Sequence, residues 1–243
     1  MTERLFLEDQ SAREMTACVL AAAETGIALD RTIFYARSGG QPGDVGILRW
    51  PGGETAIVDT VKGEGETILH VPAPGAALPP EGAEVAGEID YAFRHKLMRM
   101  HTAMHLLCAA LPGIAVTGGQ VGAEKSRLDF DIAEPPDRAA IEARLNALIA
   151  GDYPVGAMWV DESVLDADPG LVRTLSVQPP RGAGRLRLVR IGGEAAPIDL
   201  QPCGGTHVSR TGEIGPMVIA KIENKGRQNR RIVLQFAATG ERA

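Results

Sequence analysis

Two pairs of residues in this chain have side chains that can bind a metal ion. His101 and His105 lie four residues apart, about one turn of a helix, so their imidazoles can point in the same direction. Cys203 and His207 have the same spacing, and the two glycines between them let the backbone curl so that both side chains converge. Three imidazole nitrogens and one thiolate suit tetrahedral Zn²⁺. These residues predict one zinc site assembled from two distant segments.

Each pair could instead have a purely structural role. A lone His-x-x-x-His pair on an apolar helix face is more often two buried, hydrogen-bonded histidines than a ligand pair, and a lone Cys-x-x-x-His pair is equally unspecific. Both pairs occur here, however, and together they use three of the five histidines and one of the three cysteines. Their joint occurrence favours zinc. The spacing differs from that of zinc fingers, because a long stretch of chain separates the pairs.

The residues leave open how the zinc would act. Four protein ligands fill a tetrahedral shell, whereas a catalytic zinc keeps one position open. Either one ligand, with His207 as the first candidate, binds weakly or not at all, or the metal expands its shell. The helix motif also differs from the His-Glu-x-x-His motif of zinc proteases, because Thr102 and Ala103 follow His101 and the general-base glutamate is missing. An ordinary zinc protease is thereby disfavoured.

The elements that must position these residues follow from the hydrophobic pattern. Apolar residues recur at spacings of three and four over residues 94–111, which predicts a one-sided helix that ends at Pro112. Ahead of this helix the pattern predicts only β structure. We expect short strands at residues 15–23, 27–36, 46–50, 55–62, 67–71 and 85–89. Short strands at such close spacing are typical of a small barrel.

The chain after this helix combines helix and strand patterns. We expect a helix at residues 137–150 and strands at residues 126–132, 155–161, 185–191, 217–222 and 231–237. The segment between Ile191 and Gly215, which contains Cys203 and His207, has no regular pattern. The predicted fold class is therefore α+β, with an N-terminal small β-barrel domain at residues 1–90 and an α+β domain with the zinc site at residues 91–243.

Composition and charge narrow the class of protein. Hydrophobic residues make up 44% and charged residues 23% of the 243 residues, as in soluble globular chains. The formal charge of −6 disfavours a broad, sequence-indifferent nucleic-acid binder but allows a local basic patch. Three scattered cysteines fit a reducing compartment. The acidic N-terminal residues are not those of a signal peptide, so we expect none, and no apolar run reaches the ~18–20 residues that a membrane helix needs. We expect a cytoplasmic protein with no membrane contact and no obligate protein partner.

Five segments resemble the motifs of one family. They are HTAMHLL at 101–107, CGGTH at 203–207, SGGQPGD at 38–44, Gln120 with RLDF at 127–130, and GRQNRRI at 226–232. Together they resemble the editing domain of alanyl-tRNA synthetases with its preceding barrel, and the free-standing AlaX proteins, which are alanyl-tRNA editing hydrolases. The chain is similar to the intermediate-length AlaX form. Residues 1–90 are too few and too rich in predicted strands to form an ATP-dependent aminoacylation domain, so we expect none. We also expect the C-terminal extension of the longest AlaX forms to be missing.

The resemblance implies a zinc-dependent, ATP-independent hydrolase that acts in trans on mischarged tRNA(Ala). It would deacylate Ser-tRNA(Ala), with Gly-tRNA(Ala) as a second substrate, and leave Ala-tRNA(Ala) intact. Two alternatives stay open. One is a non-catalytic tRNA-binding module with a structural zinc, and the other is a small-molecule zinc hydrolase on the same fold.

Such an enzyme must recognise serine, which is larger than alanine by one hydroxyl. Size exclusion cannot spare alanine, but a site that hydrogen-bonds the hydroxyl can reject the analogue lacking it by ~10⁴-fold. Thr117 and Gln120 follow the predicted histidine helix and are polar enough to provide this contact in the catalytic site. The alternative is that both are ordinary loop residues.

The glycine-rich segment is the expected substrate-binding loop. By resemblance to the family's glycine motif, Ser38, Gly39, Gly40 and Gln41 would close over the amino-acid pocket. A pair of tight turns is the alternative. The segment is not a nucleotide-binding P-loop, because no Gly-Lys-Ser/Thr follows it.

Positive charge gathers in two places. A cluster near the C-terminus is expected to bind the phosphates of the tRNA acceptor stem and consists of Lys221, Lys225, Arg227, Arg230 and Arg231. Arg94, Lys96 and Arg99 add charge beside His101. The alternative for the C-terminal cluster is an ordinary solvated turn.

Overall fold

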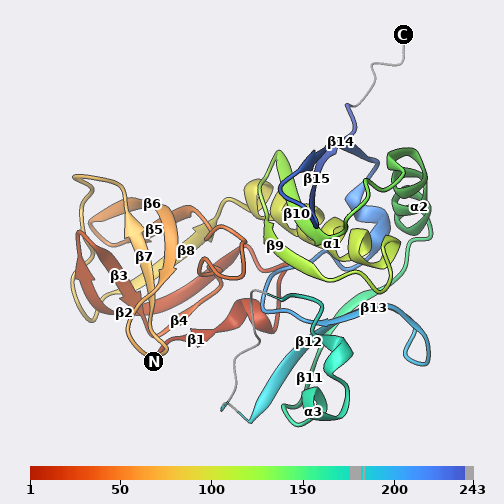
Figure 1. Ribbon diagram of the computed structural model, residues 1–243. Helices are drawn as coiled ribbons and strands as arrows, with labels where there is room; N and C mark the ends of the chain where they lie inside the picture. The colour runs from red at the N-terminus through yellow and green to blue at the C-terminus, as the bar shows by residue number, and fades with distance from the viewer. Residues whose placement is uncertain (176–181, 183, 239–243) are drawn as a thin grey trace. The chain divides into compact units, whose positions relative to one another are not determined.

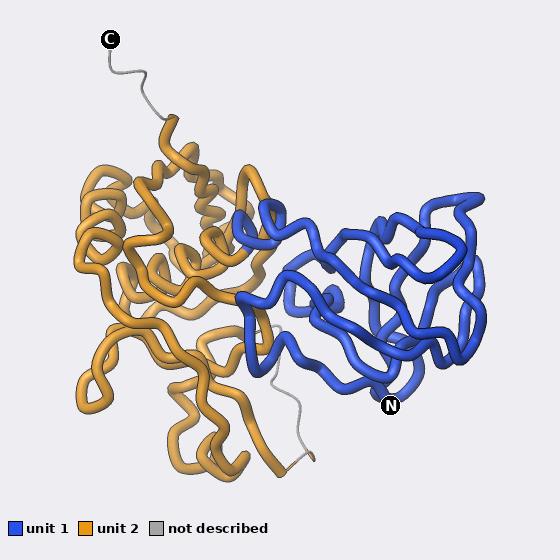
Figure 2. The backbone as a smooth tube through the Cα atoms, turned by 180° about the vertical axis from the view of Figure 1, so that it is seen from behind, with its two compact units in different colours: residues 1–97 blue, residues 98–243 orange. Residues whose placement is uncertain are grey.

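The computed structural model describes residues 1–175, 182 and 184–238 and divides into two compact units, residues 1–97 and 98–243 (Figures 1 and 2). The boundary lies within helix α1 (Tyr91–Ala110), whereas the predicted domain border lies just before this helix begins. Each unit has a hydrophobic cluster of its own. Among the described residues, no helix has both the length and the apolar character needed to cross a bilayer.

Six antiparallel strands of the first unit close into a barrel, as predicted, in the order β2-β3-β7-β6-β5-β8. They are β2 (Glu14–Ala23), β3 (Gly26–Leu29), β5 (Gly46–Trp50), β6 (Gly53–Lys62), β7 (Ile68–Pro72) and β8 (Glu84–Ile89). Buried and exposed side chains alternate along β8, and the buried ones join Val19, Leu48 and Ile57 in the core. The short strands β1 (Glu3–Arg4) and β4 (Arg31–Thr32) pair in parallel, and η1 (Leu5–Leu7) is a single 3₁₀ turn.

The strand predicted at residues 27–36 is interrupted after Leu29, because side chains bind the backbone beyond it. The Asp44 carboxylate accepts a hydrogen bond from the Tyr35 N–H at 2.6 Å, and Arg94 donates to the Ile33 carbonyl at 2.6 Å. Asp44 and Arg94 also form an ion pair in which neither side chain is more than 1% exposed. This buried pair joins the end of the glycine-rich segment to the first turn of α1.

The second unit contains two antiparallel sheets, with strand orders β14-β15-β10-β9 and β11-β12-β13. Their strands are β9 (Val116–Gln120), β10 (Lys125–Asp131), β11 (Val155–Asp161), β12 (Arg185–Gly192), β13 (Pro197–Pro202), β14 (Met217–Asn224) and β15 (Asn229–Phe236). Helix α2 (Arg138–Ala150) begins after Asp137, whose carboxylate accepts hydrogen bonds from two backbone N–H groups. The connections contain α3 (Val164–Ala167), η2 (Pro169–Leu171) and η3 (Thr211–Ile214).

Two strands of the second unit differ from the prediction. Thr117 and Gln120 lie in β9 and not in a loop, and β13 occupies part of the segment predicted as irregular. β9 contains two consecutive glycines, β13 has a proline at each end, and both strands lie at the edge of their sheets. Glycine and proline are uncommon inside strands and are tolerated at edges, so neither segment has a clear strand pattern.

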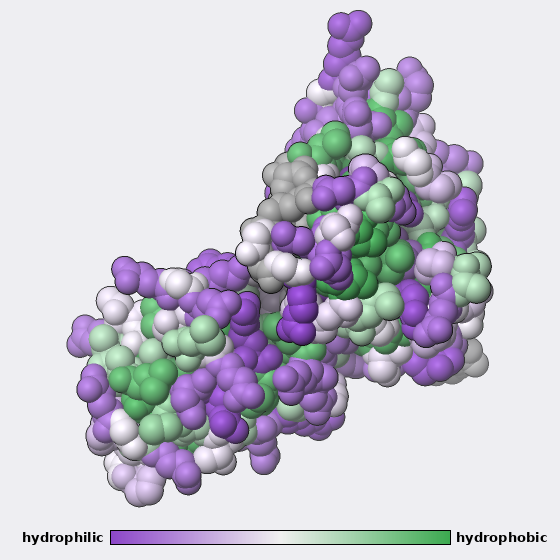
Figure 3. Space-filling model, turned by 90° about the horizontal axis from the view of Figure 1, so that it is seen from below, coloured by the Kyte–Doolittle hydropathy of each residue, from purple (hydrophilic) through white to green (hydrophobic). Residues whose placement is uncertain are grey.

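On the face shown in Figure 3, hydrophilic and hydrophobic side chains are interspersed. The large apolar side chains that are more than a third exposed include Leu20 and Val58 on the barrel and Met158, Trp159 and Leu175 in the second unit. Met158 and Trp159 are consecutive residues of β11, so they point to opposite faces of the sheet. Apolar side chains exposed singly in this way are ordinary and define no docking surface.

Candidate metal centre

Helix α1 buries His101 and His105, as predicted, but the expectation of a one-sided helix is wrong, because every residue from Met100 to Leu111 is buried. The two imidazoles are 8% and 7% exposed, and Met100 and Met104 beside them are buried as well. Their ring centroids lie 5.4 Å apart, as expected for residues one helical turn apart. The helix therefore presents two imidazoles to the interior of the second unit.

The loop that carries Cys203 and His207 begins where β13 ends, and Arg187 on the neighbouring strand holds it. Arg187 Nη1 donates hydrogen bonds to the carbonyl oxygens of Cys203 at 2.6 Å and Gly205 at 3.1 Å. The Arg187 carbonyl in turn accepts from the Cys203 N–H. Neither glycine of the loop has a positive φ, so the curl expected from the glycines comes from these bonds and not from a left-handed backbone.

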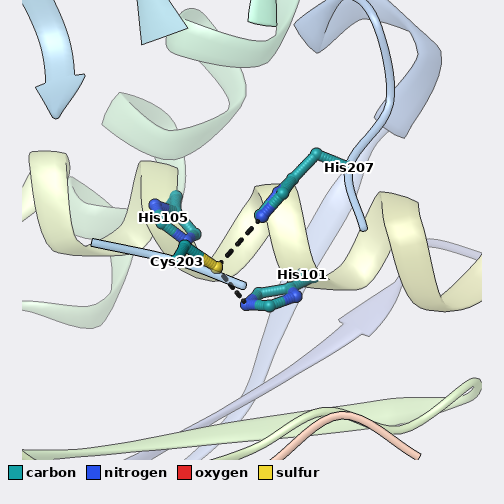
Figure 4. Close-up of side chains that lie close together, drawn as sticks. All are labelled: His101, His105, Cys203 and His207. Carbon is teal, nitrogen blue, oxygen red and sulfur yellow. Dashed lines mark hydrogen bonds between the residues drawn. The ribbon is translucent and has the colours of Figure 1, made fainter. Parts of the chain in front are cut away.

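All four predicted ligands converge on one point (Figure 4). One ligand atom from each of His101, His105, Cys203 and His207 can be chosen so that all lie within 4.8 Å of one another. Cys203 Sγ is 3.6 Å from His101 Nε2 and 3.3 Å from His207 Nε2. Tetrahedral zinc with ordinary Zn–S and Zn–N bonds separates its ligand atoms by roughly 3.3–3.6 Å. The arrangement could therefore hold a metal ion, and the N₃S donor set fits zinc.

Two further side chains bind the outer nitrogens of the ligands. Asp199 Oδ2 lies 2.8 Å from His105 Nδ1, and Thr102 Oγ1 lies 3.1 Å from His207 Nδ1. A carboxylate only accepts hydrogen bonds, so His105 donates through Nδ1 and leaves Nε2 for a metal. Metal-binding histidines usually have such a partner for their second nitrogen. The same arrangement at His207 favours its inclusion among the ligands.

Electrostatics at the cluster favour the metal-binding forms of Cys203 and His207. Burial raises the pKa of Cys203, but electrostatic interaction with His101 and His207 and hydrogen bonds from His101 and His105 bring this pKa well below its ordinary value. Burial and the neighbouring His101 lower the pKa of His207 to about 3, against the opposing effect of Cys203. A thiolate and a neutral imidazole are the species that bind metals.

The pKa of His105 is shifted in the opposite direction to those of Cys203 and His207. Burial lowers its pKa, but the hydrogen bonds with Asp199 and Cys203 and the negative charges of both outweigh burial and raise the pKa to about 10. A metal ion that binds Nε2 of His105 would replace a proton there. The proton on Nδ1 would stay, because Asp199 binds it.

Thr117 and Gln120 have different surroundings on β9. The pairing of β9 with β10 is shifted between Val116 and Gly118, which makes Thr117 the extra residue of a β-bulge. Its hydroxyl oxygen is buried and has no hydrogen-bond partner among the described residues. Gln120 is exposed, and its Oε1 accepts a hydrogen bond from Arg127 at 3.3 Å. Of the two residues, Thr117 has a buried side-chain oxygen without a partner in the part of the chain that the structure describes.

The glycine-rich segment forms the tight turn that was the alternative for it. Backbone hydrogen bonds join Ser38 and Gln41 in both directions, and Gly39 and Gly40 have φ values of 57° and 82°. Two consecutive positive φ values are typical of a type I′ turn and favour glycine. Gly39 and Gly40 are exposed, whereas the Gln41 side chain is buried. A role of this turn in substrate binding stays a prediction.

The C-terminal basic cluster is largely paired with acidic residues. Lys221 and Lys225 both form ion pairs with Glu223, and Arg231 binds Asp129 through two hydrogen bonds of 2.7 and 2.8 Å. Among the described residues of this cluster, Arg227 is exposed and has no acidic partner, so it is the residue most readily available to a polyanion. A hollow of about 520 Å³ lies beside the cluster and is lined in part by Arg138 and Lys221.

Arg230 differs from the rest of that cluster because it is buried. Its guanidinium donates to the carbonyl oxygens of Ala133, Gly226 and Asn229 and thus holds the β14–β15 hairpin. The arginines near His101 are likewise engaged. Arg94 is buried against Asp44, and Arg99 donates to the Ile214 carbonyl at 2.6 and 2.8 Å. The expectation of a phosphate contact therefore has no support for these three arginines, whose charges satisfy backbone carbonyls or a carboxylate.

Asp199, Gln201, Thr102 and Arg187 are residues that the sequence analysis missed as parts of this site. Asp199 and Gln201 alternate with Ile198 and Leu200 along β13, and an alternating pattern could have predicted a strand there. It would have placed the polar side chains toward solvent, however, whereas Asp199 and Gln201 are the buried ones. Thr102 has a clearer signal, since it adjoins His101 on a helix.

Two family descriptions match parts of the chain. Residues 186–233 match the family described as the threonyl and alanyl tRNA synthetase second additional domain, and residues 5–93 match the class II (A) tRNA synthetases. The first match includes the Cys203–His207 loop, and the second covers the barrel strands.

Individual relatives cover nearly the whole chain. The alanyl-tRNA editing protein AlaX-M of Methanosarcina acetivorans is 38% identical over 96% of this chain and 98% of that protein. The AlaX-M protein of Saccharolobus solfataricus is 33% identical with the same coverage of 96% and 98%. The alanine–tRNA ligase of Pyrobaculum arsenaticum is 39% identical over 91% of the chain but only 25% of the ligase. The chain thus spans about a quarter of the ligase and nearly all of each editing protein.

Proposed function

Because the chain belongs to the AlaX-M family of alanyl-tRNA editing proteins, we propose that it is an aminoacyl-tRNA deacylase that acts in trans on mischarged tRNA(Ala). The proposed reaction is hydrolysis of the ester between serine and the terminal ribose, with alanine spared. The observation that carries this proposal is the convergence of His101, His105, Cys203 and His207 in a unit whose bulged strand offers an unpartnered threonine hydroxyl.

Zinc is the proposed metal of the cluster, since imidazole and thiolate ligands suit it. Bound zinc would supply a positive charge that can orient the substrate, polarise its ester carbonyl or lower the pKa of a water molecule. The protein would contribute four ligands and a mostly buried site. Asp199 and Thr102 would accept hydrogen bonds from Nδ1 of His105 and His207 and thereby orient these two ligands. With all four bound, substrate contact would require the loss of one ligand or a fifth position.

Thr117 is the proposed source of selectivity for serine. The buried Thr117 hydroxyl has no partner among residues 1–175, 182 and 184–238, and a serine hydroxyl from the substrate could provide one. Alanine would leave Thr117 unpaired, so the site would bind the transition state for alanine release more weakly. Glycine also lacks the hydroxyl. Serine is therefore the proposed main substrate, and glycine is a second candidate that this contact does not favour.

Contacts to the tRNA are proposed at the exposed basic residues of the C-terminal cluster. Lys221, Lys225, Arg227 and Arg231 are more exposed than Arg230. The ion pairs of Lys221 and Lys225 with Glu223, and of Arg231 with Asp129, are open to exchange with phosphate. The turn at Ser38, Gly39, Gly40 and Gln41, of which the two glycines are exposed, is proposed to contact the terminal adenosine or the amino acid.

Incubation with tRNA(Ala) charged with serine, glycine or alanine tests the proposal. Selective release of serine supports the deacylase. Tight binding of all three charged tRNAs without release would favour a non-catalytic module with structural zinc. A zinc-loaded protein that neither binds nor cleaves any of them would favour the small-molecule hydrolase.

A further inference from the structure

We propose that Asp199 is a positioning residue that sets the tautomer of His105, so that Nε2 of this histidine faces the metal, and that Gln201 and Arg173 fix the orientation of the Asp199 carboxylate. This inference rests on the metal site of the proposed function. It gives a role to Asp199 and Gln201 of β13, which are not themselves candidate ligands of the metal.

The burial of these groups is unusual for an edge strand. Asp199 and Gln201 are 1% and 7% exposed and lie two residues apart, on the same side of β13. An edge strand normally places its apolar residues inward and its polar residues toward water. A carboxylate buried in this way must be compensated by hydrogen bonds or charge. The buried charge of Asp199 is compensated by hydrogen-bond donors and a nearby cation.

Three residues surround the Asp199 carboxylate. His105 Nδ1 lies 2.8 Å from Oδ2, and Gln201 Nε2 donates to both oxygens, at 2.8 Å to Oδ1 and 2.9 Å to Oδ2. The Arg173 guanidinium lies 3.9 Å from Oδ1. Each of these three neighbours is a donor or a cation. The carboxylate is therefore held in one orientation and can offer only a lone pair to His105.

The consequence for the ligand is specific. An imidazole that binds a metal must carry its proton on the nitrogen that does not bind it, and the partner of that second nitrogen decides which tautomer forms. Of the two nitrogens of His105, Asp199 accepts from Nδ1, so the lone pair of Nε2 is available on the side of Cys203 and His207. Metal-site partners of this kind typically affect metal affinity by about 10–100-fold.

The environment also predicts how an amide would behave at this position. In Asp199→Asn, the oxygen of the new amide would turn toward the Oδ1 position, where Gln201 donates at 2.8 Å and the Arg173 cation lies 3.9 Å away. Its NH₂ group would then point at His105 Nδ1 and require that nitrogen to accept. The proton would move to Nε2, the nitrogen that must bind the metal. A nearly isosteric change would thus favour the wrong tautomer.

The first test is zinc affinity, measured on the full-length protein by competition with a chromophoric chelator. Asp199→Asn is expected to bind Zn²⁺ about 10–100-fold more weakly. Asp131→Asn, the same chemical change at the exposed end of β10, is the matched control and should bind Zn²⁺ like the unmodified protein. Equal zinc affinity of Asp199→Asn and the unmodified protein would overturn the inference.

The second test needs no variant and so does not depend on whether Asp199→Asn folds. In the zinc-loaded protein, long-range ¹H–¹⁵N NMR spectra should show the His105 proton on Nδ1 and the metal on Nε2. A proton on Nε2 would overturn the inference. Neither test uses charged tRNA. A protein with the expected tautomer that releases no serine would contradict the proposed function and leave this inference intact.

Discussion

The hydroxyl oxygen of Thr102 lies 3.1 Å from Nδ1 of His207 and 2.9 Å from the carbonyl oxygen of Met98. Both contacts are hydrogen bonds only when His207 donates through Nδ1, which leaves the Nε2 lone pair 3.3 Å from Cys203 Sγ. A threonine of the histidine helix thus orients a ligand that lies far along the chain.

Replacement of Thr102 by valine tests this relationship. Thr102→Val removes the acceptor for His207 Nδ1–H with little change in volume, so zinc affinity is expected to fall roughly 10-fold. Thr102→Ser keeps the hydroxyl and should retain most of the affinity. Competition titration with a chelator measures both. A Thr102→Val protein that binds zinc as tightly as Thr102→Ser would show that the hydroxyl does not orient His207.

Thr117 is expected to control activity on serine more than zinc binding. Thr117→Val removes the hydroxyl proposed to bind the serine side chain, a hydrogen bond worth about 1 kcal/mol. The kcat/KM for Ser-tRNA(Ala) should fall by about 5–10-fold, because 1.4 kcal/mol corresponds to a factor of ten. Thr117→Ser is the matched control that keeps the hydroxyl. An unchanged serine rate in Thr117→Val, at full zinc content, would remove Thr117 from the selectivity site.

The barrel is expected to lose stability in mild acid through His70. This imidazole is fully buried between the Ile27 carbonyl and the Thr32 hydroxyl, and burial lowers its pKa to about 4. The unfolded chain, with an ordinary pKa near 6.5, binds more protons between these values. The contribution of neutral, buried His70 to the free energy of unfolding is therefore complete above pH 6.5 and is lost as the pH falls toward 4. Its upper bound is roughly 3 kcal/mol.

Chemical unfolding at several pH values measures this effect, and the variant His70→Gln isolates it from other groups. The unmodified protein should lose more free energy of unfolding between pH 7 and pH 4.5 than His70→Gln does. Parallel pH profiles for the two proteins would contradict the assignment.

Binding of tRNA is expected to depend on salt through the exposed part of the C-terminal cluster. Lys225→Gln combined with Arg227→Gln removes two positive charges, so the slope of log affinity against log salt should fall by at most about 2. Arg144→Gln, an exposed change on α2, is the control for loss of charge. Filter binding or fluorescence anisotropy at several salt concentrations measures the slopes. Identical slopes for the double variant and the unmodified protein would exclude these two residues.

The barrel strands and helix α1 could be predicted because they follow from short-range patterns of apolar and polar residues. The barrel strands alternate in hydropathy, and the apolar stripe of α1 predicts that His101 and His105 face inward, which is confirmed. The convergence of Cys203 and His207 on them could be predicted only from chemistry, since no local pattern joins residues so far apart. The two pairs have the residue types and spacing of zinc ligands, and this predicted that they meet in one site.

The features that could not be predicted are buried polar side chains whose partners lie far away in the sequence. β13 carries Asp199 and Gln201 inward, and a hydropathy pattern assigns such residues to the solvent side. Arg94 and Arg230 looked like surface charges, yet each is buried because carboxylate or carbonyl groups from distant segments bind it. Polar residues become interior when partners meet them there, and the partners are known only once the chain has folded.

The central claim is selective removal of serine, and single-turnover deacylation tests it most directly. The zinc-loaded protein, in excess, is mixed in parallel with tRNA(Ala) charged with serine and with alanine, and the release of each amino acid is followed. We predict that serine is released at least about 100-fold faster than alanine, and that Cys203→Ala, which lacks a ligand, abolishes the difference. Equal rates for serine and alanine, or equal activity of Cys203→Ala, would contradict the account.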